Sequence, residues 1–333
     1  MGTYLLRRLI GTIPVMVLIS LLVFLLIQAA PGDPTLMLLG EDSTQEDIDQ
    51  ATKRWGLDQP IYVQYIKFFM SAVQGDFGRS FKYDEPVLDV IVNRIPATLE
   101  LATASVMIAL VFAIPLGVWA AAKPNSWVDN TGTTFGLFGI SMPSFWFGIM
   151  LILLFAGILN ILPSAGRDTY GISGEPITGF YILDSALQGN WAGVRDGAEH
   201  VFLPAVALGS NMLGILMRVT RSSVLEVMNE EYVTTARAKG LVERKVLWRH
   251  VFSNALIPVI TVVGLELGTL LSGSIIVETV FSWPGSGSLL VTALNARDHP
   301  LVTGLVLVYT AAFVAINFLI DVLYAIIDPR IRY

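Results

Sequence analysis

The 333-residue sequence has no cysteine, three histidines and few charged residues. The absence of cysteine excludes disulfide bonds, thiolate metal sites and cysteine nucleophiles. The histidines, at positions 200, 250 and 299, are too widely separated to indicate a metal cluster. A typical soluble domain carries about 25% charged residues, whereas this chain has 14% charged and 54% hydrophobic residues. Such a chain lacks the polar surface needed to face water on every side, so the composition predicts a membrane protein.

The short motifs of common catalytic and nucleotide-binding sites are also missing. The sequence contains no GxxxxGK[ST] phosphate loop, no HExxH zinc motif and no GxSxG nucleophile motif. The candidate acids, bases and nucleophiles do not cluster along the chain. We therefore predict that the chain is not an enzyme and has no catalytic residue, no metal and no cofactor of its own.

Long apolar runs predict where the chain crosses a bilayer. A spanning helix needs about 20 mostly apolar residues because the hydrocarbon core is about 30 Å thick. Six runs qualify, so we predict an all-α membrane protein with spans at about 9–30, 97–122, 132–161, 200–219, 253–277 and 301–327. Neighbouring helices can satisfy carbonyls freed by proline. We therefore expect the prolines in these runs to kink the helices rather than end them: Pro14, Pro115, Pro143, Pro204 and Pro258.

The distribution of lysine and arginine predicts which ends face the cytoplasm. If the N-terminus is cytoplasmic, the inner segments carry 12 of the 21 basic residues in 60 positions, and the outer segments carry nine in 127. Basic residues concentrate on the cytoplasmic side of membrane proteins. With an even number of spans, both termini are predicted to be cytoplasmic.

The outer segment 31–96 is too long for a simple turn and shows helical periodicity. Ser43 to Glu46 has the spacing of a capping box, and Pro60 stands where a helix tolerates proline at its start. We expect short surface helices here. They either dock an extracytoplasmic partner or shield the ends of the spans, and the pattern leaves both readings open.

The inner segment 218–252 has the pattern of an amphipathic helix and a second short helix separated by a glycine. Apolar and charged residues alternate with helical periodicity from Val224 to Arg237, and Gly240 is typical of a helix C-terminus. A second helix is expected to restart at Glu243 and to carry basic residues up to the fifth span. An exposed short helix can insert into a groove of another protein. It can also lie on anionic headgroups, and the pattern does not decide between the two.

Charged and polar residues inside the spans are candidates for a translocation path. Three carboxylates lie within the spans, Glu100, Glu266 and Asp321, and a carboxylate in hydrocarbon is costly enough to suggest function. Each can equally be a packing residue with a hydrogen bond between helices. The candidates for the path are Asn211, Glu266, Ser272 and Asn317.

Several motifs together resemble those of ABC importer permeases, specifically the dipeptide/oligopeptide/nickel family. The strongest is the segment 231–240, which continues to Arg249-His250 and 254–258 and looks like the ATPase-coupling segment of that family. The position of the leading Glu in the wider importer pattern is Thr234, and the closing Pro falls later, at Pro258. Other matching stretches are 5–9, 30–34, 75–78, 96–101, 278–285 and 328–332, so the match runs nearly end to end.

Within the family, residues 177–180 with Leu183 and Asp184 look most like the dipeptide permease subunit of the first-gene (B) type. The resemblance implies a single transmembrane domain over 1–333 in a bacterial inner membrane. It also implies a homologous second permease subunit, two ABC ATPases that bind ATP and magnesium, an extracytoplasmic solute-binding protein, a peptide substrate and surrounding lipid, but no nucleic acid. The cargo can also be an oligopeptide, haem or a nickel chelate. A proton-coupled transporter working alone, with Glu266 or Asp321 as its proton site, is the alternative class.

In this interpretation the segment 220–252 contains a cytoplasmic coupling helix between spans four and five, and its motion accompanies ATP binding by the partner subunits. The residues that the resemblance places at the ATPase contact are Glu231, Tyr232, Thr234, Thr235, Ala236, Arg237, Ala238, Lys239 and Gly240.

Overall fold

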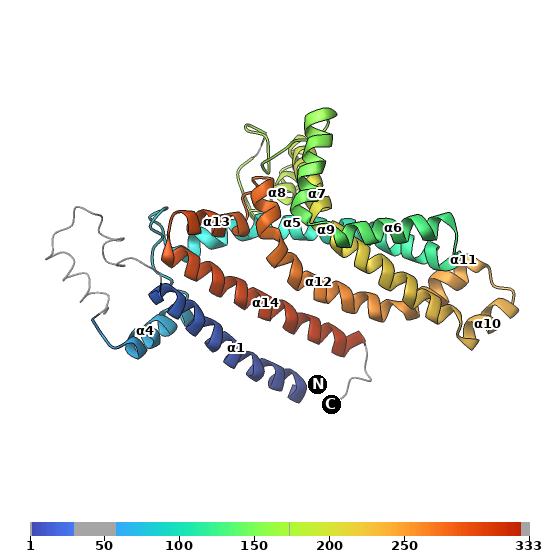
Figure 1. The fold of residues 1–333 in the computed structure, drawn as a ribbon, viewed down its shortest axis with the longest axis horizontal. Helices are drawn as coiled ribbons and strands as arrows, with labels where there is room; N and C mark the ends of the chain where they lie inside the picture. Colours follow the sequence, from blue (N-terminus) through green and yellow to red (C-terminus); the bar gives the residue numbers. More distant parts are fainter. Residues whose placement is uncertain (1, 30–57, 173, 328–333) are drawn as a thin grey trace. The chain divides into compact units, whose positions relative to one another are not determined.

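The structure is a computed structural model that describes residues 2–29, 58–172 and 174–327. Within these residues every named element is a helix, and the pairing of Arg79 with Pro86 is an isolated β-bridge (Figure 1). Among the described residues, four helices are long and apolar enough to cross a membrane, or five if one sharply bent pair is a single span. The all-α prediction is therefore confirmed, and the structure supports four or five of the six predicted spans.

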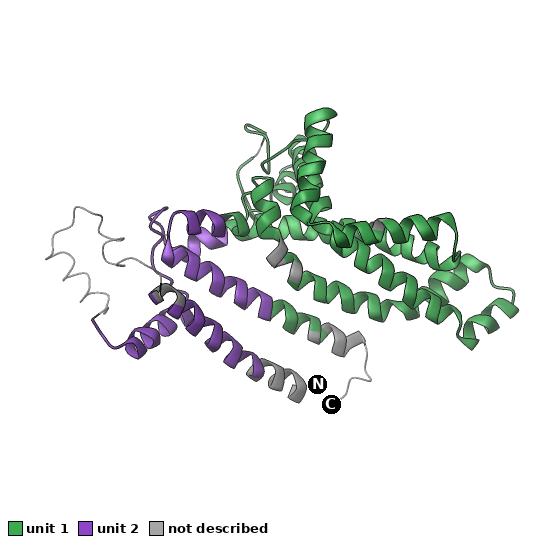
Figure 2. Ribbon diagram, in the orientation of Figure 1, with its two compact units in different colours: residues 1, 94–288, 315–333 green, residues 2–93, 289–314 purple. Residues whose placement is uncertain are grey.

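The described chain forms two compact units (Figure 2). The larger unit comprises residues 94–288 and the end of the last helix, and the smaller comprises residues 2–93 with 289–314. The helices of the larger unit are α5 (Val87–Ala122, from Arg94), α6 (Trp127–Ser141), α7 (Ser144–Leu151), η1 (Ile152–Ile158), α8 (Tyr181–Leu187), α9 (Trp191–Met228), α10 (Glu231–Ala238), α11 (Glu243–Lys245), η2 (Val246–Phe252) and α12 (Ser253–Val280). Those of the smaller unit are α1 (Gly2–Ala29), α4 (Ile61–Val73), and parts of α13 (Ser286–Asn295) and α14 (His299–Ile327).

Helix α9 is the centre of the larger unit. It packs against α6, α7, α8 and α12, and its buried side chains include Leu203, Met212 and Leu216. Pro204 lies inside it, and Pro14, Pro115 and Pro258 likewise lie inside α1, α5 and α12. At these four positions the expectation that proline does not end the helix is confirmed.

Glycines bring α6 and α9 into close contact. A Cβ on Gly214 of α9 would collide with the carbonyl oxygen of Gly136, and a Cβ on Gly132 would collide with Met217. A Cβ on Gly139 would lie 2.6 Å from the Ser210 carbonyl oxygen. Small residues allow helix backbones to approach in this way. The contact therefore depends on glycine at positions 214 and 139, where the clash is with backbone, and less at position 132, where it is with the end of the Met217 side chain.

The expectation that Pro143 kinks the helix over 132–161 without ending it is wrong. Helix α6 ends at Ser141, Met142 and Pro143 are extended, and α7 starts at Ser144 with a bend of 109° between the two helical parts. Proline disfavours helical geometry in the residue before it, which accounts for Met142 at φ −88°, ψ 131°. Pro143 therefore ends one helix and precedes another.

In the smaller unit, α4 confirms the helix expected after Pro60. Its aromatic residues pack on α1, where the Phe24 ring lies 5.5 Å from Tyr65 and 5.6 Å from Phe68. The hydroxyls of Ser20 and Tyr65 are 3.0 Å apart. Helix α1 covers the first predicted span up to Ala29, although the described apolar part, Gly11–Leu25, is shorter than a full span. The helix expected after Ser43 lies outside the described residues.

Buried carboxylates organise the long segment between η1 and α9. Glu100 of α5 forms an ion pair with Arg167, Oε2 to Nη2 2.6 Å, and accepts a hydrogen bond from the Ile182 backbone. Asp184 of α8 accepts hydrogen bonds from the backbone N–H groups of Ile177, Thr178 and Gly179. Glu100, considered above as a path residue, therefore holds this segment on α5.

Replacing Asp184 by asparagine is expected to loosen this segment in a pH-dependent way. Burial favours a raised pKa for Asp184, but hydrogen bonds from Thr178, Ile177 and Gly179 outweigh it and hold the pKa below its ordinary value. The stabilisation is therefore full at neutral pH and is lost as the pH falls below about 4 and through the lowered pKa. We expect D184N to be cleaved about ten-fold faster than wild type in limited proteolysis at neutral pH.

The difference in cleavage rate between D184N and wild type should disappear in strong acid. Thermolysin measures the rates at neutral pH, and pepsin measures them at low pH. Equal cleavage at neutral pH would show that these hydrogen bonds do not hold the segment.

Candidate functional site

The candidate site is the hairpin formed by the end of α9, the short helix α10 and the start of α11. Helix α10 ends in a Schellman motif, in which Gly240 N–H donates to the Arg237 carbonyl at 2.9 Å and Leu241 N–H donates to the Ala236 carbonyl at 3.4 Å. Gly240 has φ +77°, a conformation that glycine adopts without strain. The predicted helix end at Gly240 is confirmed, and the chain resumes a helix at Glu243.

The apolar face of α10 is buried within the chain itself. Val233 and Ala236 belong to a core cluster with Val246 and Val251 of η2, and with Val224, Val118, Ala121 and Ala255. Val233 has no exposed area, and Ala236 is 7% exposed. These two side chains are therefore unavailable to lie among lipid acyl chains, and α10 has a fixed orientation on α9 and η2.

The opposite face of α10 is exposed and polar. The exposed predicted contact residues are Glu231, Tyr232, Thr234, Thr235, Ala238, Lys239 and Gly240. Arg237 is half-buried and makes two hydrogen bonds to the Glu243 carboxylate, at 2.7 and 3.2 Å. Hydrogen bonding to Glu243 raises the pKa of Arg237 above its ordinary value. Of the nine predicted contact residues, the structure places seven on the surface, and Ala236 alone is fully turned inward.

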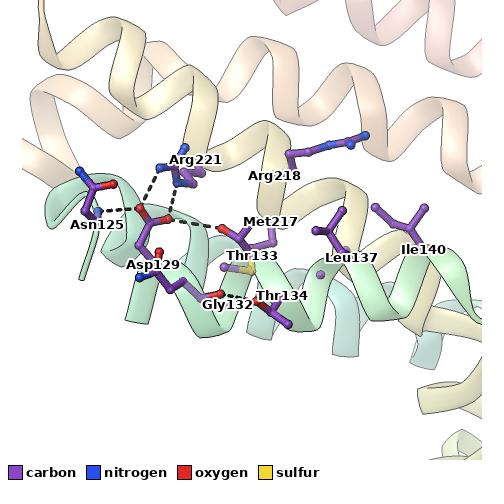
Figure 3. Close-up of a pocket in the computed structure, with 13 residues that line it drawn as sticks. Asn125, Asp129, Gly132, Thr133, Thr134, Leu137, Ile140, Met217, Arg218 and Arg221 are labelled. Carbon is purple, nitrogen blue, oxygen red and sulfur yellow. Dashed lines mark hydrogen bonds and ion pairs between the residues drawn. The ribbon is translucent and has the colours of Figure 1, made fainter. Parts of the chain in front are cut away.

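A second ion pair lies at the base of the hairpin, between α9 and α6 (Figure 3). Arg221 donates through Nε and Nη2 to the two carboxylate oxygens of Asp129, at 2.5 and 2.8 Å. The Asp129 carboxylate also accepts from the Asn125 backbone N–H at 2.9 Å. The pair borders a cavity of about 570 Å³ that Arg218 and Met217 also line. It therefore joins the α6 N-terminus to the last turns of α9, directly before α10.

The candidates for a translocation path are distributed over three helices. Asn211 is exposed on α9, Glu266 is half-buried on α12 and Asn317 is half-buried on α14. The side chains of Ser272 and Asp321 lie outside the described residues. The role of these residues in lining a path stays a prediction.

Local sequence patterns did not predict the buried carboxylate at the end of α12. Glu278 has no exposed area; its Oε1 accepts from the Thr98 hydroxyl at 2.8 Å and its Oε2 accepts from the Ser288 N–H at 2.9 Å. Next to it, the indole N–H of Trp283 donates to the Ala97 carbonyl at 2.8 Å. Glu278 lies within 278–285, one of the stretches that match the family motifs. That match was the one indication in the sequence that Glu278 has a role.

Because one face of α10 is exposed and the other is buried, cysteines introduced on the two faces should differ in reactivity. Because the chain has no cysteine, a single introduced cysteine gives an unambiguous label. We expect Thr235→Cys, on the exposed face, to react with a maleimide at least about ten-fold faster than Ala236→Cys in the folded chain, because local opening must precede reaction at the buried position. The control is denatured protein, in which both should react at one rate. Equal rates in the folded chain would contradict the orientation of α10.

These features define a class of protein: a helical membrane component that presents a polar hairpin helix at its surface. The sequence profile of the "binding-protein-dependent transport system inner membrane component" family matches residues 113–333. That of the N-terminal part of the same membrane components matches residues 1–102. The chain belongs to this family of ABC transporter permeases, so it is a transport subunit of a bacterial inner membrane and not itself an enzyme.

Similar proteins align over nearly the whole chain. The dipeptide transport system permease protein DppB of Escherichia coli strain K12 is 42% identical, covering 99% of this chain and 98% of the relative. The di/tripeptide transport system permease protein DppB of Pseudomonas aeruginosa strain UCBPP-PA14 is 41% identical, covering 100% and 99%. The glutathione transport system permease protein GsiC of E. coli strain K12 is 38% identical, covering 100% of both. Members of this family work with a membrane-embedded partner, an ATPase and a binding protein.

Proposed function

We propose that this chain is the permease subunit through which an ATP-driven importer takes up dipeptides or other short peptides. The names of the relatives support this cargo, since they are transport permeases for dipeptides, di/tripeptides and glutathione. Oligopeptides, haem or a nickel chelate are the alternative cargoes within the same class. The peptide passes along a path for which Asn211, Glu266, Ser272 and Asn317 are the candidate lining residues.

The proposed assembly contains a second, homologous permease subunit, two ABC ATPases and an extracytoplasmic solute-binding protein. ATP and magnesium bind to the ATPases, and this chain holds no cofactor. The chain acts as one transmembrane domain with six spans, both termini in the cytoplasm, and the segment 31–96 outside. This sidedness rests on the excess of lysine and arginine in the segments assigned to the cytoplasm.

The observation that carries the coupling role is the division of α10 into two faces. Val233 and Ala236 fix the helix on the chain's own core, while Tyr232, Thr234 and Thr235 remain exposed. An ATPase that binds the exposed face moves a helix that is anchored on α9 and η2. Nucleotide binding then shifts the population between outward-facing and inward-facing states, because the two states differ in their contacts with the ATPases.

The proposal is tested with the Thr235→Cys chain reconstituted with its co-purified subunits in proteoliposomes. We expect the ATPases to protect the thiol introduced at position 235 from a maleimide. In a second chain, Tyr170→Cys, the thiol lies at an exposed position of the predicted outer segment and should stay reactive. Uptake of a labelled dipeptide should require ATP and the binding protein.

Two results would contradict the proposal. An unprotected thiol at position 235 would contradict the contact between α10 and the ATPases. Uptake without any ATPase, driven by a proton gradient, would contradict the class of mechanism.

A further inference from the structure

An exposed basic and aromatic patch lies just after the hairpin, on α11 and η2. Val242, Arg244, Lys245, Trp248 and Arg249 line a shallow hollow of about 590 Å³. Val242 is 73% exposed and Trp248 is 37% exposed, and the three cationic side chains are exposed as well. We call these five residues the basic-aromatic patch. It combines positive charge with apolar surface in one place.

The local structure explains why these side chains share one surface. Val246 and Val251 turn inward and are fully buried in the cluster that also seats α10. The π-helical turn of η2 brings Trp248 and Arg249 to the same hollow as Val242. The Trp248 ring is supported edge-to-face by Phe252 at 5.3 Å. The patch is thus attached to the core rather than carried on a loop.

The charge of the patch is not neutralised within the described chain. Arg237 and Arg221, which precede the patch in sequence, are paired with Glu243 and Asp129. By contrast, across residues 58–172 and 174–327 the structure gives no ion pair for Arg244, Lys245 or Arg249. Three positive charges beside an exposed indole therefore offer a complementary surface to an anion that has an apolar part.

We propose that the basic-aromatic patch binds the headgroup of an anionic phospholipid of the inner leaflet. The inference rests on the proposed cytoplasmic position of the hairpin. The patch ends shortly before Ser253, where the fifth predicted span begins. Tryptophan is enriched at the membrane interface, and basic residues next to a span bind anionic headgroups. The lipid phosphate pairs with the three cations of the patch, while Val242 and Trp248 contact the glycerol and the first acyl carbons.

The position of the patch favours lipid over an ATPase subunit as its occupant. Val242 and Trp248, the large hydrophobic side chains exposed between α10 and α12, lie shortly before the fifth predicted span, where aromatic side chains meet the bilayer interface. The ATPase contact proposed above uses a different surface, on α10. Lipid bound at the patch anchors the start of α12 at the bilayer surface next to the coupling helix, so coupling becomes sensitive to the lipid composition of the membrane.

The first test measures proximity of the patch to lipid in the whole complex, in nanodiscs of phosphatidylcholine with or without phosphatidylglycerol. A fluorophore on Lys245→Cys should be quenched strongly by brominated phosphatidylglycerol and weakly by brominated phosphatidylcholine. The control is a fluorophore on Asn229→Cys, at an exposed position before α10, which should be quenched by neither lipid.

The second test measures affinity in a native mass spectrometry titration of the same complex. Each cation near an anionic surface strengthens binding about five-fold, so Arg244→Gln with Arg249→Gln is expected to weaken phosphatidylglycerol binding about 25-fold. The matched control is Lys123→Gln with Arg218→Gln, which removes two predicted cytoplasmic cations outside the patch and should leave this binding unchanged.

Two results would overturn the inference. Equal quenching by both lipids would show that the patch has no preference for an anionic headgroup. Loss of ATPase attachment in the Arg244→Gln, Arg249→Gln chain, with phosphatidylglycerol binding unchanged, would assign the patch to the ATPase. Neither result would contradict the proposed function. The proposed function is contradicted instead by an unprotected thiol at position 235 or by uptake without the ATPases.

Discussion

Replacement of Gly240 by valine is expected to abolish ATP-driven uptake and to weaken attachment of the ATPases. Gly240 has φ +77°, and a β-branched residue in this region costs about 1–3 kcal/mol. A Cβ at this position would meet no atom within 4 Å, so the expected effect comes from backbone strain. The strain is relieved by opening the Schellman turn, which displaces the end of α10.

Two matched variants separate this effect from a general loss of stability. Gly240→Asn should retain most uptake, because asparagine tolerates the left-handed conformation better than valine. Gly171→Val places the same strain in an open position of the outer segment, at φ +87°, and should leave ATPase attachment intact. Uptake and ATPase co-purification are the measurements, and normal uptake by Gly240→Val would count against the coupling role of the hairpin.

Replacement of Glu278 by alanine should give the largest loss of stability among the substitutions considered. The carboxylate is fully buried, and its removal takes the acceptor from the Ser288 N–H and one partner from the Thr98 hydroxyl, which also lies 2.9 Å from the Ser286 hydroxyl. A Cβ on Gly285 would collide with this carboxylate, and a Cβ on Gly287 would collide with it and with the Ile275 backbone. The loop 281–288 therefore packs closely around the carboxylate. The lost hydrogen bonds and the new cavity together cost about 3–4 kcal/mol.

Thermal unfolding in detergent, followed by tryptophan fluorescence, measures the loss at Glu278. Glu278→Gln keeps the volume and one acceptor oxygen, so its loss should be about half as large. Glu175→Ala removes an exposed carboxylate and should change the unfolding temperature little. If Glu278→Ala unfolds at the wild-type temperature, the hydrogen bonds of Glu278 do not hold the loop.

The features that depend on neighbouring residues could be predicted from the sequence. Gly240 ends α10 in the left-handed conformation, and the signal for that end was a glycine directly after a segment of helical periodicity. The helix after Pro60 follows from a local start signal in the same way. The inward orientation of Val233 agrees with the predicted amphipathic pattern, whereas Ala236, predicted as a contact residue, is buried.

Contacts between distant segments could not be predicted in this way. Thr98 and Glu278 are 180 residues apart, and Arg167 is 67 residues from Glu100, so no local pattern connects them. The prediction at Pro143 was wrong for a different reason. Proline inside an apolar run either kinks or ends a helix, and the outcome depends on whether neighbouring helices can satisfy the freed backbone groups.

The helix from Glu243 to Val280 runs through α11, η2 and α12 with no intervening loop. Leu241 and Val242 are the two residues between the left-handed turn at Gly240 and its first residue. The backbone therefore connects the hairpin to the far end of α12 through helix alone. We expect a displacement of the hairpin to be transmitted along this helix to the fifth predicted span.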